Sequence, residues 1–480
     1  MAAAFTLDLP RFMVLSSNDR NDYMGYSRGK EGHGYLAFVE TQVVSPYAKF
    51  EVERADEDGL VHIRSCQNNK YWVRTKNVSI TGNTAEQYWI TSTAKKPEND
   101  QSKESCTLFK PITVDAATNT FRIMHVQSGC YLCLWPLDKG VFSRCVLANY
   151  KVFDDQKLDI FKTIDWNSLV ILPKYLAFKG DNGQYLCLRQ IERHPYLQFS
   201  TDDIGDPTVA FENFTTQDGT LRIKSSYNNQ IWRRSPNWIW ADSSDDASSN
   251  NNKDTLFRPV KVDDQTIALI NLGNNYFCKR LTTEGKTSCL NAATPSVVNE
   301  AKLKVEEPVL TRSIDNVKYD LENSRVYDEM VLVVAKNSAT NNTQQSANLD
   351  VKLSYTDYRT STWKTMHSLK LAMKANMDFS LPLIAEGKID LSGEVQSRVE
   401  WGSTTTTTTI LEVVHKIVVA PMTKVTVNLL ATNGKCDVPF TFTQRDTLYN
   451  GTTVTTEVQG GTYTGSNYYN IDFQTKEEKI

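Results

Sequence analysis

Apolar and polar residues alternate along much of the final third of the chain, and the longest alternation lies in residues 369–399. Successive side chains of a β-strand point to opposite faces, so a period of two predicts strands and not helices. Residues 369–379 and 389–399 form two arms of 11 residues each, and both arms carry their apolar residues at odd-numbered positions. The pattern predicts a β-hairpin with one apolar face and a largely apolar tip at residues 381–387.

Two interpretations of this hairpin are open. Its apolar face could pack on an ordinary core. The arms, however, exceed the roughly five or six residues of a typical strand and match the roughly 9 to 11 residues with which a β-strand crosses a bilayer. We therefore expect a hairpin that leaves its fold, closes into a ring with copies from other subunits and inserts into a membrane. The expected inserting residues are Leu369, Leu371, Met373, Met377, Phe379, Leu381, Leu383, Ile384, Ile389, Leu391, Val395 and Val399.

The first two thirds of the chain contain a sixfold repeat. In each unit a turn-forming Asn, Asp or Gly leads into a short apolar strand, near Tyr23, Tyr71, Tyr131, Tyr185, Ile231 and Tyr276. An apolar residue closes each unit, at Phe50, Phe109, Phe161, Phe211, Phe257 and Leu303. Units of this length are typical of propeller blades and of trefoil lobes. Since three lobes close one trefoil, six units predict two trefoils.

The repeat and a change of composition near residue 313 predict three domains. We expect a first β-trefoil at residues 1–164 and a second at 165–312, because the longest connection between repeat units begins near residue 165. Residues 313–480 are threonine-rich, lack the repeat and predict an elongated β module. Within it, residues 403–409 predict a solvated strand with hydroxyl groups on both faces. Next to the hairpin, a strand that lines a polar lumen after assembly is the alternative. The expected fold class is all-β, with two tandem β-trefoil domains before the elongated module.

Composition narrows the functional classes. The hydrophobic content of 40% is that of a globular protein, and the formal net charge of -3 gives no electrostatic reason to expect a nucleic acid as partner. The N-terminus lacks the basic start and apolar run of a signal peptide, which predicts a cytoplasmic or released soluble protein. Nine cysteines without regular spacing favour reduced thiols.

The chain has no Gly-x-Ser-x-Gly, phosphate-binding glycine loop or His-Glu-x-x-His motif, so we expect no enzyme and no cofactor. A carboxylate pair for glycoside cleavage stays open, because such a pair would meet only in the fold. Cys130 and Cys133, with His125 nearby, are the candidate zinc ligands. Cys187 and Cys278 recur at similar strand positions, which favours small core residues and no metal site.

Several motifs resemble a known family. The stretches GLVHIRSCQNNKYWVR (59–74), YWITSTA (88–94), CTLFKPI (106–112), SPNWIW (235–240) and LFRPV (256–260) resemble, in this order, the amaranthin-type plant lectins, over roughly residues 5–308. The final third resembles the aerolysin-type pore-forming module in pattern. The whole chain is similar to the plant lectin-toxin chimeras that join these parts. This resemblance implies two agglutinin trefoils and an aerolysin-like module.

The resemblance also implies a sugar site. Amaranthin-type lectins bind galactose linked to N-acetylgalactosamine between the first trefoil of one subunit and the second trefoil of another. The first-trefoil part corresponds here to Arg74, Tyr88 and Trp89, with Asn77 or Gln87 bonding the hydroxyl groups of a sugar that stacks on the rings. A core position for Trp89 is the alternative. Residues 75–87 replace a shorter link of the family. Asn237 and Trp238 keep the family pattern in the second trefoil, either as carbohydrate-binding residues or as structural relics.

Together these features predict a carbohydrate-binding lectin that targets a pore-forming module to glycosylated membranes, as a plant defence toxin. The expected partners are glycans of the galactose or N-acetylgalactosamine type, further copies of the chain in a homo-oligomer, and a membrane after assembly. The alternative is a non-lytic lectin whose C-terminal β module serves oligomerisation or display.

Overall fold

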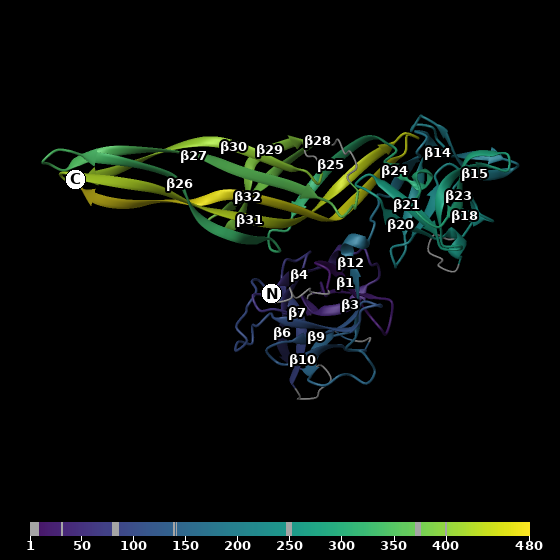
Figure 1. Cartoon of the computed structure of the whole chain (residues 1–480), viewed down its shortest axis with the longest axis horizontal. Helices are drawn as coiled ribbons and strands as arrows, with labels where there is room; N and C mark the ends of the chain where they lie inside the picture. The colour runs from purple at the N-terminus through teal and green to yellow at the C-terminus, as the bar shows by residue number, and fades with distance from the viewer. Residues whose placement is uncertain are drawn as a thin grey trace, which may run out of the picture. The chain divides into compact units, whose positions relative to one another are not determined.

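The computed structural model describes residues 9–29, 32–78, 86–137, 140, 142–245, 252–369, 376–398 and 401–480 of the chain. Its strands form three sheets of 12, 12 and 8 strands, which follow one another along the chain (Figure 1). The described residues contain short 3-10 helices but no α-helix. The predicted all-β fold class is therefore confirmed.

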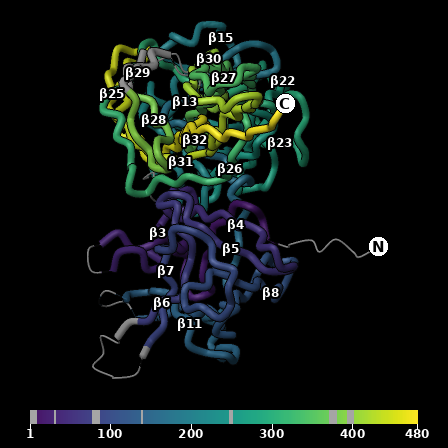
Figure 2. The backbone as a smooth tube through the Cα atoms, turned by 90° about the vertical axis from the view of Figure 1, so that its left-hand side faces the viewer, coloured from purple at the N-terminus to yellow at the C-terminus, as the bar shows by residue number. Residues whose placement is uncertain are grey.

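The first twelve strands form a β-trefoil around a common core. Figure 2 shows several of these strands, among them β3, β7 and β11, gathered in one body. Its elements are β1 (Phe12–Ser17), β2 (Tyr23–Tyr26), β3 (Leu36–Glu40), η2 (Pro46–Ala48), β4 (Phe50–Arg54), β5 (Val61–Ser65), β6 (Tyr71–Val78), β7 (Glu86–Ala94), β8 (Phe109–Asp115), β9 (Thr120–His125), β10 (Cys130–Leu134), β11 (Val146–Tyr150) and β12 (Phe161–Asp165).

The next twelve strands form a second trefoil with its own core. Its elements are η3 (Trp166–Ser168), β13 (Tyr175–Lys179), β14 (Tyr185–Ile191), β15 (His194–Thr201), β16 (Phe211–Thr215), β17 (Leu221–Ser225), β18 (Ile231–Ser235), β19 (Trp238–Ser243), η4 (Lys253–Thr255), β20 (Phe257–Lys261), β21 (Thr266–Asn271), β22 (Tyr276–Thr283), β23 (Lys286–Thr294), η5 (Asn299–Ala301) and β24 (Leu303–Glu306).

The sixfold repeat is present in the structure. Its opening phrases form β2, β6, β10, β14, β18 and β22, and its closing residues begin β4, β8, β12, β16, β20 and β24. Asn69, Asn229 and Asn275 precede their strands with φ angles of 55°, 58° and 59°, the left-handed conformation that asparagine tolerates. The six closing residues are all buried in the two cores, which explains why each position is apolar.

The final sheet is built from strands of up to 27 residues, and its module is elongated (Figure 1). Its strands are β25 (Val309–Tyr319), β26 (Arg325–Asn341), β27 (Ala347–Lys364), β28 (Asn376–Ala385), β29 (Lys388–Arg398), β30 (Thr404–Val419), β31 (Thr423–Leu448) and β32 (Thr453–Lys479). Its core is centred on Trp363, Phe440 and Tyr463. The threonine run lies in β30 with residues 404–409 exposed, as predicted.

The described contacts divide the chain into two compact units. The first unit comprises Met1–Arg312, Met366–Leu371 and Arg445–Thr455, and the second comprises Ser313–Thr365, Ala372–Gln444 and Thr456–Ile480. Two short segments of the final third thus belong with the trefoils.

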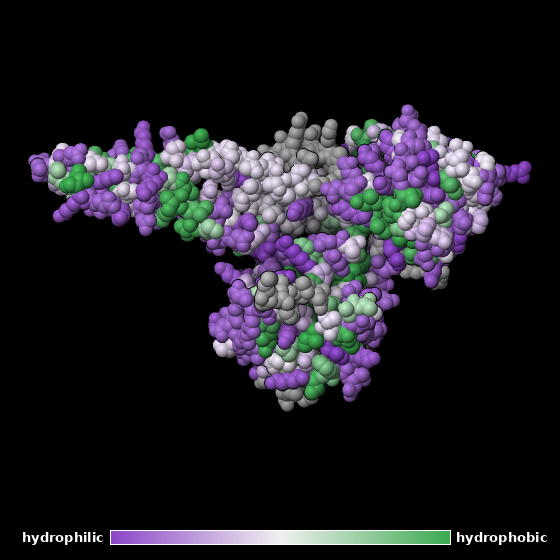
Figure 3. All heavy atoms as spheres, viewed as in Figure 1, coloured by the Kyte–Doolittle hydropathy of each residue, from purple (hydrophilic) through white to green (hydrophobic). Residues whose placement is uncertain are grey.

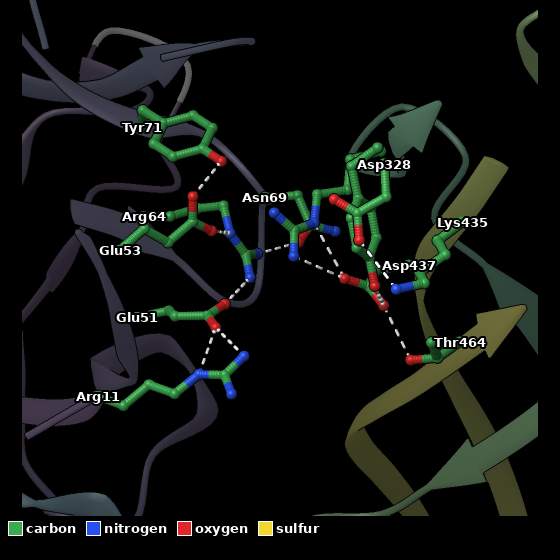
Figure 4. Close-up of polar contacts among 12 residues, drawn as sticks. Arg11, Glu51, Glu53, Arg64, Asn69, Tyr71, Asp328, Lys435, Asp437 and Thr464 are labelled. Atoms are coloured by element: carbon green, nitrogen blue, oxygen red, sulfur yellow. Dashed lines mark hydrogen bonds and ion pairs between the residues drawn. The ribbon is translucent and has the colours of Figure 1, made fainter. Parts of the chain in front are cut away.

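A cluster of polar side chains orients the start of β6 in the first trefoil, and Figure 4 shows its members. Arg64 donates hydrogen bonds to Glu51, Glu53 and Asn69, and the Tyr71 hydroxyl donates to Glu53 at 2.7 Å. Arg64 and Glu51 are both buried, so their charges are satisfied inside the lobe. The network holds the first residue of the strand that carries Arg74.

A second cluster of polar side chains links three strands of the β module by hydrogen bonds, and it is also drawn in Figure 4. Asp437 on β31 accepts a hydrogen bond from Arg325 on β26 at 2.9 Å and one from Thr464 on β32 at 2.8 Å. Because Asp437 is buried, these bonds compensate for its lost hydration. They fix β26, β31 and β32 side by side.

Candidate functional site

The first-trefoil part of the predicted sugar site is a stacked pair of side chains. Arg74 on β6 lies over the ring of Tyr88 on β7, with its Cζ 3.5 Å from the ring centroid. The Arg74 Nε donates to the Ala148 carbonyl at 2.9 Å, and the Tyr88 amide donates to Asn149 Oδ1 at 2.9 Å. Partial burial lowers the pKa of Arg74 from its usual value. Hydrogen bonds to Ala148 and Asn149 therefore fix both residues of the pair, and the side chains of Arg74 and Tyr88 are half-buried.

Trp89 does not offer a ring face to a sugar. Its side chain is 1% exposed and stacks on Phe142, with ring centroids 4.3 Å apart and an interplanar angle of 6°. The expectation that Trp89 supplies a stacking face is wrong, because the alternation of β7 turns this residue inward. The alternative, a core position, describes the structure.

The polar residues expected at the site are only partly described. Gln87 is half-buried on β7, and the backbone of Asn77 on β6 pairs with it. The Asn77 side chain and residues 79–85 lie outside the described part of the chain. Hydrogen bonding of a sugar by Asn77 or Gln87 thus stays a prediction.

In the second trefoil, the two predicted residues differ in exposure. Trp238 is 5% exposed, and its Nε1 donates to Glu284 at 3.2 Å, so the ring belongs to the trefoil interior. Asn237 is exposed, and its Oδ1 accepts from Arg234 at 3.2 Å. The resemblance places Trp238 among the candidate sugar-binding residues or the structural relics, and its buried ring agrees with a structural role.

Other aromatic residues, which the motif comparison missed, lie at the surface of both trefoils. Trp240 is half-buried, and the His194 ring stacks on it with a centroid distance of 4.1 Å. Tyr150 and Phe153 are more than half exposed, and Tyr150 follows the Asn149 that contacts Tyr88. The exposure of Tyr150 and Phe153 could have been predicted from the sequence. Both residues lie in the polar stretch around β11, which does not predict a core position for a large ring.

The candidate zinc ligands are engaged elsewhere. The two ring nitrogens of His125 make hydrogen bonds with Ser128 Oγ at 3.0 Å and the Cys106 carbonyl at 3.1 Å. Burial raises the pKa of the Cys133 thiol to about 12, which disfavours a thiolate ligand. Among the residues that the structure describes, no group of three His, Cys, Asp or Glu side chains could hold a metal ion.

His125 should make the stability of the first trefoil sensitive to acid. Burial lowers the pKa of His125 from 6.5 to about 4, so the unfolded chain takes up a proton at this residue before the folded chain does. Its contribution to stability is complete above pH 6.5 and is lost as the pH falls toward 4. Urea unfolding at pH 7 and pH 4.5 should show that His125→Gln removes about 2 to 3 kcal/mol of the difference between the two conditions. An unchanged difference would contradict this role.

The hairpin exists, but its tip lies elsewhere than expected. β28 and β29 join through Glu386 and Gly387, whose φ angles of 49° and 74° form a tight two-residue turn. Residues 381–385, expected at an exposed apolar tip, belong to β28, and Ile384 is 2% exposed. The tip prediction is wrong because the Glu-Gly pair adopts the left-handed conformation that closes a hairpin.

The other predicted inserting residues divide into three groups. Ile389 is buried beside Ile384 in the module core, whereas Leu391 is 46% exposed and Leu381 and Leu383 are half-buried. For Met377, Phe379 and Val395 only the backbone is described, and it lies in β28 and β29. Leu371, Met373 and Val399 lie outside the described residues.

Leu369 belongs to the first unit, not to the unit that contains the hairpin. It is buried in the core cluster of the second trefoil, and the preceding Ser368 is bonded to the connection between the trefoils. The Ser368 amide donates to the Ile171 carbonyl at 2.9 Å, and the Ile171 amide donates to Ser368 Oγ at 2.8 Å. Lys261 Nζ donates to the Ser368 carbonyl at 2.9 Å. The chain that leads into the hairpin is thus fastened within the first unit.

Two families of known proteins match the chain. The agglutinin domain family matches residues 7–165 and 170–307. The family of Clostridium epsilon toxin and Bacillus mosquitocidal toxin, ETX/MTX2, matches residues 294–476. These are lectin and toxin families, not enzyme families. Within the described residues, no helix has the length and apolar character needed to cross a bilayer.

Solved structures with low sequence identity resemble parts of the chain. A lamprey immune protein is 13% identical, with 64% of this chain and 91% of that chain covered and a TM-score of 0.30. An aerolysin-like protein of Bombina maxima is 14% identical, with 35% and 99% covered and a TM-score of 0.23. The parasporin-2 toxin of Bacillus thuringiensis is 17% identical, with 43% and 88% covered and a TM-score of 0.21. No curated protein sequence matches the chain.

The two agglutinin matches together cover more than half of the chain, and each coincides with one trefoil sheet. The toxin match coincides with the third sheet. The chain therefore belongs to the agglutinin-domain family, as a lectin-toxin fusion in which an ETX/MTX2 toxin domain follows two agglutinin domains.

Proposed function

We propose that the trefoil pair binds galactose-type or N-acetylgalactosamine-type glycans on a membrane and that several copies then insert the β28–β29 hairpin as a pore. The observation that carries this proposal is the hairpin itself. β28 and β29 contain 10 and 11 residues, which matches the roughly 9 to 11 residues that cross a bilayer. A plant defence role, implied by the resemblance to plant lectin-toxin chimeras, is part of the proposal.

The position of the hairpin supports its release. In the sheet order, β29 is the terminal strand, and the hairpin adjoins the sheet through β25. The described pairing of β28 with β25 is parallel and lies at Ser313 and Asn376. A hairpin at a sheet edge can separate without splitting the remaining strands apart.

Exposed apolar residues support assembly of several copies. Ile410, Val414 and Val418 on β30 are each about half exposed or more, and β30 is the opposite end of the sheet. Figure 3 shows apolar patches along the β module. Such residues at a sheet end suit contact with another copy of the chain.

The glycan part of the proposal rests on the half-buried Arg74 and Tyr88 pair and the exposed Tyr150. Aromatic rings pack against the apolar face of a galactose ring, and a guanidinium group donates hydrogen bonds to its hydroxyl groups. Dye-loaded liposomes with a glycolipid ending in galactose linked to N-acetylgalactosamine should release dye at lower protein concentration than plain liposomes. The free disaccharide should remove this advantage. Equal release from both kinds of liposome would contradict glycan targeting.

Leu391→Asp separates a pore former from the alternative of a non-lytic display module. The side chain is 46% exposed, so the soluble fold should accept the charge, whereas a membrane-facing strand should not. We expect sugar binding and solubility to remain and dye release to fall to background. Leu391→Asn is the matched uncharged control and should release dye at an intermediate rate. Misfolding of Leu391→Asp, or full release by it, would favour the display module or a different inserting segment.

A further inference from the structure

The first unit contains a cavity that residues of both trefoils line. Its volume is about 740 Å³, which lies within the roughly 300 to 1,000 Å³ of sites for small molecules. The connection from β1 to β2 and the strand β12 form its first wall. The turn between β16 and β17 and the short helix η4 form its second wall. Neither Arg74 nor Tyr88 lines this cavity, so it is separate from the candidate galactose site.

Hydrogen bonds join the two walls of the cavity. The Val43 amide donates to the Gln217 carbonyl at 2.9 Å, and Gln217 Nε2 donates to the Asn21 carbonyl at 2.5 Å. Gly219 in the same turn has a φ angle of 84°, and a Cβ atom added there would lie 3.1 Å from Val43 Cγ1. The turn thus needs glycine both for its backbone conformation and for its close approach to the first trefoil. The walls are therefore fixed to each other in the absence of a ligand.

The two acidic side chains of the cavity already have partners within the protein. Asp218 accepts hydrogen bonds from the hydroxyl groups of Thr216 at 2.7 Å and Thr220 at 2.8 Å. Asp19 accepts a hydrogen bond from Arg144 Nη1 at 3.0 Å. Both carboxylates are thus engaged by groups of the protein.

Two cationic side chains of the cavity have no such partner. Lys162 belongs to the first wall and Lys253 to the second, and both are exposed. Neither makes an ion pair with a residue in the described part of the chain. The third cation of the lining, Arg20, lies 3.8 Å from Asp19. The cavity therefore offers two unpaired amino groups to a negatively charged group of a ligand.

The rest of the lining provides the groups that a sugar ring requires. Ile164 and Leu256, one from each trefoil, offer apolar surface to the carbon-bound hydrogens of a ring. Ser16, Asn18 and Thr220 carry hydroxyl and amide groups that can form hydrogen bonds with sugar hydroxyl groups.

The aromatic content of the lining argues against a nucleotide. Tyr23 is the one aromatic residue among the described residues that line the cavity. Its side chain is 6% exposed and packs in the cluster that contains Val14 and Val43. A nucleobase is commonly bound by stacking on an aromatic ring, and this buried ring leaves little face for such stacking.

We propose that this cavity binds an acidic sugar, a pyranose ring with a carboxylate or sulfate group, whose charge lies between Lys162 and Lys253. The cavity gives the chain a second glycan specificity, for negatively charged glycans. The proposal goes beyond the proposed function, because it requires neither the galactose site nor the insertion of the hairpin.

Sugars that differ only in charge test the proposal on the full chain. Methyl glucuronide and methyl glucoside share one ring and differ in a carboxylate. In saturation-transfer NMR, the glucuronide should bind at least roughly tenfold more tightly, and added salt should weaken its binding. N-acetylneuraminic acid and a sulfate ester of glucose show whether a carboxylate or a sulfate is preferred. Equal binding of both methyl glycosides, or no binding of any acidic sugar, would overturn the proposal.

Lys162→Gln combined with Lys253→Gln tests the cationic pair. Binding of the acidic sugars should weaken at least roughly tenfold, because two charge-assisted hydrogen bonds are lost. Thermal unfolding should not change, since both side chains are exposed. Lys110→Gln combined with Lys302→Gln is the matched control, because these exposed lysines lie outside the cavity and carry the same charge. The control should bind acidic sugars normally. An equal loss in both double variants, or no loss in the cavity variant, would overturn the role of the pair.

Two further anions distinguish a sugar from other negatively charged ligands. Inorganic phosphate should compete with the acidic sugars at least roughly tenfold more weakly than they compete with one another, because it makes no contact with the apolar surface. Phosphatidylserine vesicles should bind the unmodified protein and the cavity variant equally. Tighter binding of phosphate than of the sugars would assign the cavity to phosphate and overturn the sugar proposal. Vesicle binding that depends on Lys162 and Lys253 would assign it to a lipid headgroup, with the same consequence.

Discussion

An oxidised disulfide between Ile384→Cys on β28 and Gly434→Cys on β31 is expected to abolish dye release from glycolipid liposomes, and reduction is expected to restore it. A Cβ atom added at Gly434 lies 3.3 Å from Cδ1 of Ile384, so the two side-chain positions face each other. The bond forms when their Cβ atoms come within about 4.5 Å of each other. The bond would tie the β28–β29 hairpin to β31. Because the proposed insertion requires the whole hairpin to leave the module, the expected loss is complete and not graded.

The controls for this experiment are the two single substitutions. The added Cβ at Gly434 also lies 3.0 Å from the Tyr469 ring, so that ring must move by a few tenths of an ångström. Gly434→Cys alone should therefore show a small loss of stability but normal release. Sugar binding by the oxidised double variant should be unchanged, since the Arg74 and Tyr88 pair lies in the first trefoil. Release by the oxidised protein at the rate of the reduced protein would exclude the β28–β29 hairpin as the inserting segment.

Replacing Arg312 is expected to cause the largest loss of stability. Its guanidinium contacts Asp446 through Nε and Nη2, both at 2.6 Å, and Glu307 through Nη1 and Nη2, at 2.9 and 2.7 Å. All three side chains are nearly buried. Burial opposes the charge of Arg312, but the hydrogen bonds and charges of Asp446 and Glu307 outweigh it and raise the pKa of Arg312.

Arg312→Met should lower the free energy of unfolding by about 3 to 5 kcal/mol, because it leaves two buried carboxylates without a cation. Thermal unfolding at pH 7 measures the effect. Adding Glu307→Gln and Asp446→Asn should recover part of the loss, since the uncompensated charges are then gone. Lys435→Met, which removes the exposed ion pair with Asp328, is the matched control and should change little. A loss with Arg312→Met as small as that of the control would contradict the importance of the buried network.

The sixfold repeat shows how much of the fold can be predicted from short stretches of the sequence. Each unit is specified by neighbouring residues: an Asn or Gly that adopts the turn, a short apolar strand after it, and one apolar residue that enters the core. Phe50 and Phe257, in different trefoils, begin equivalent strands and are both buried. Such information is contained in a few consecutive residues, so it was available without the tertiary structure.

The residues of the candidate sugar site were harder to predict than the fold. The motifs identified β6, β7 and β19 but not the direction of each ring. Trp89 and Trp238 were candidate sugar-binding residues with a structural role as the alternative, and both are buried, whereas Tyr150 and Trp240 provide exposed or half-buried rings. An aromatic residue suits a core and a sugar site equally well, so only its packing neighbours, such as Phe142 for Trp89, distinguish the two.

The sequence by itself determined the all-β class, the six lobes of two trefoils and the presence of a hairpin of two long strands. The first of these strands, predicted at residues 369–379, lies at Asn376–Ala385. Only the tertiary structure decided the turn at Glu386 and Gly387, the burial of Leu369 in the second trefoil, and the register that opposes Leu383 to Asp390. The physical reason is that alternation along one strand shows which of its residues share a face. It does not show the register in which that strand pairs with its neighbour. That register is set by contacts such as Asn467 with Ile384, 83 residues apart in the chain.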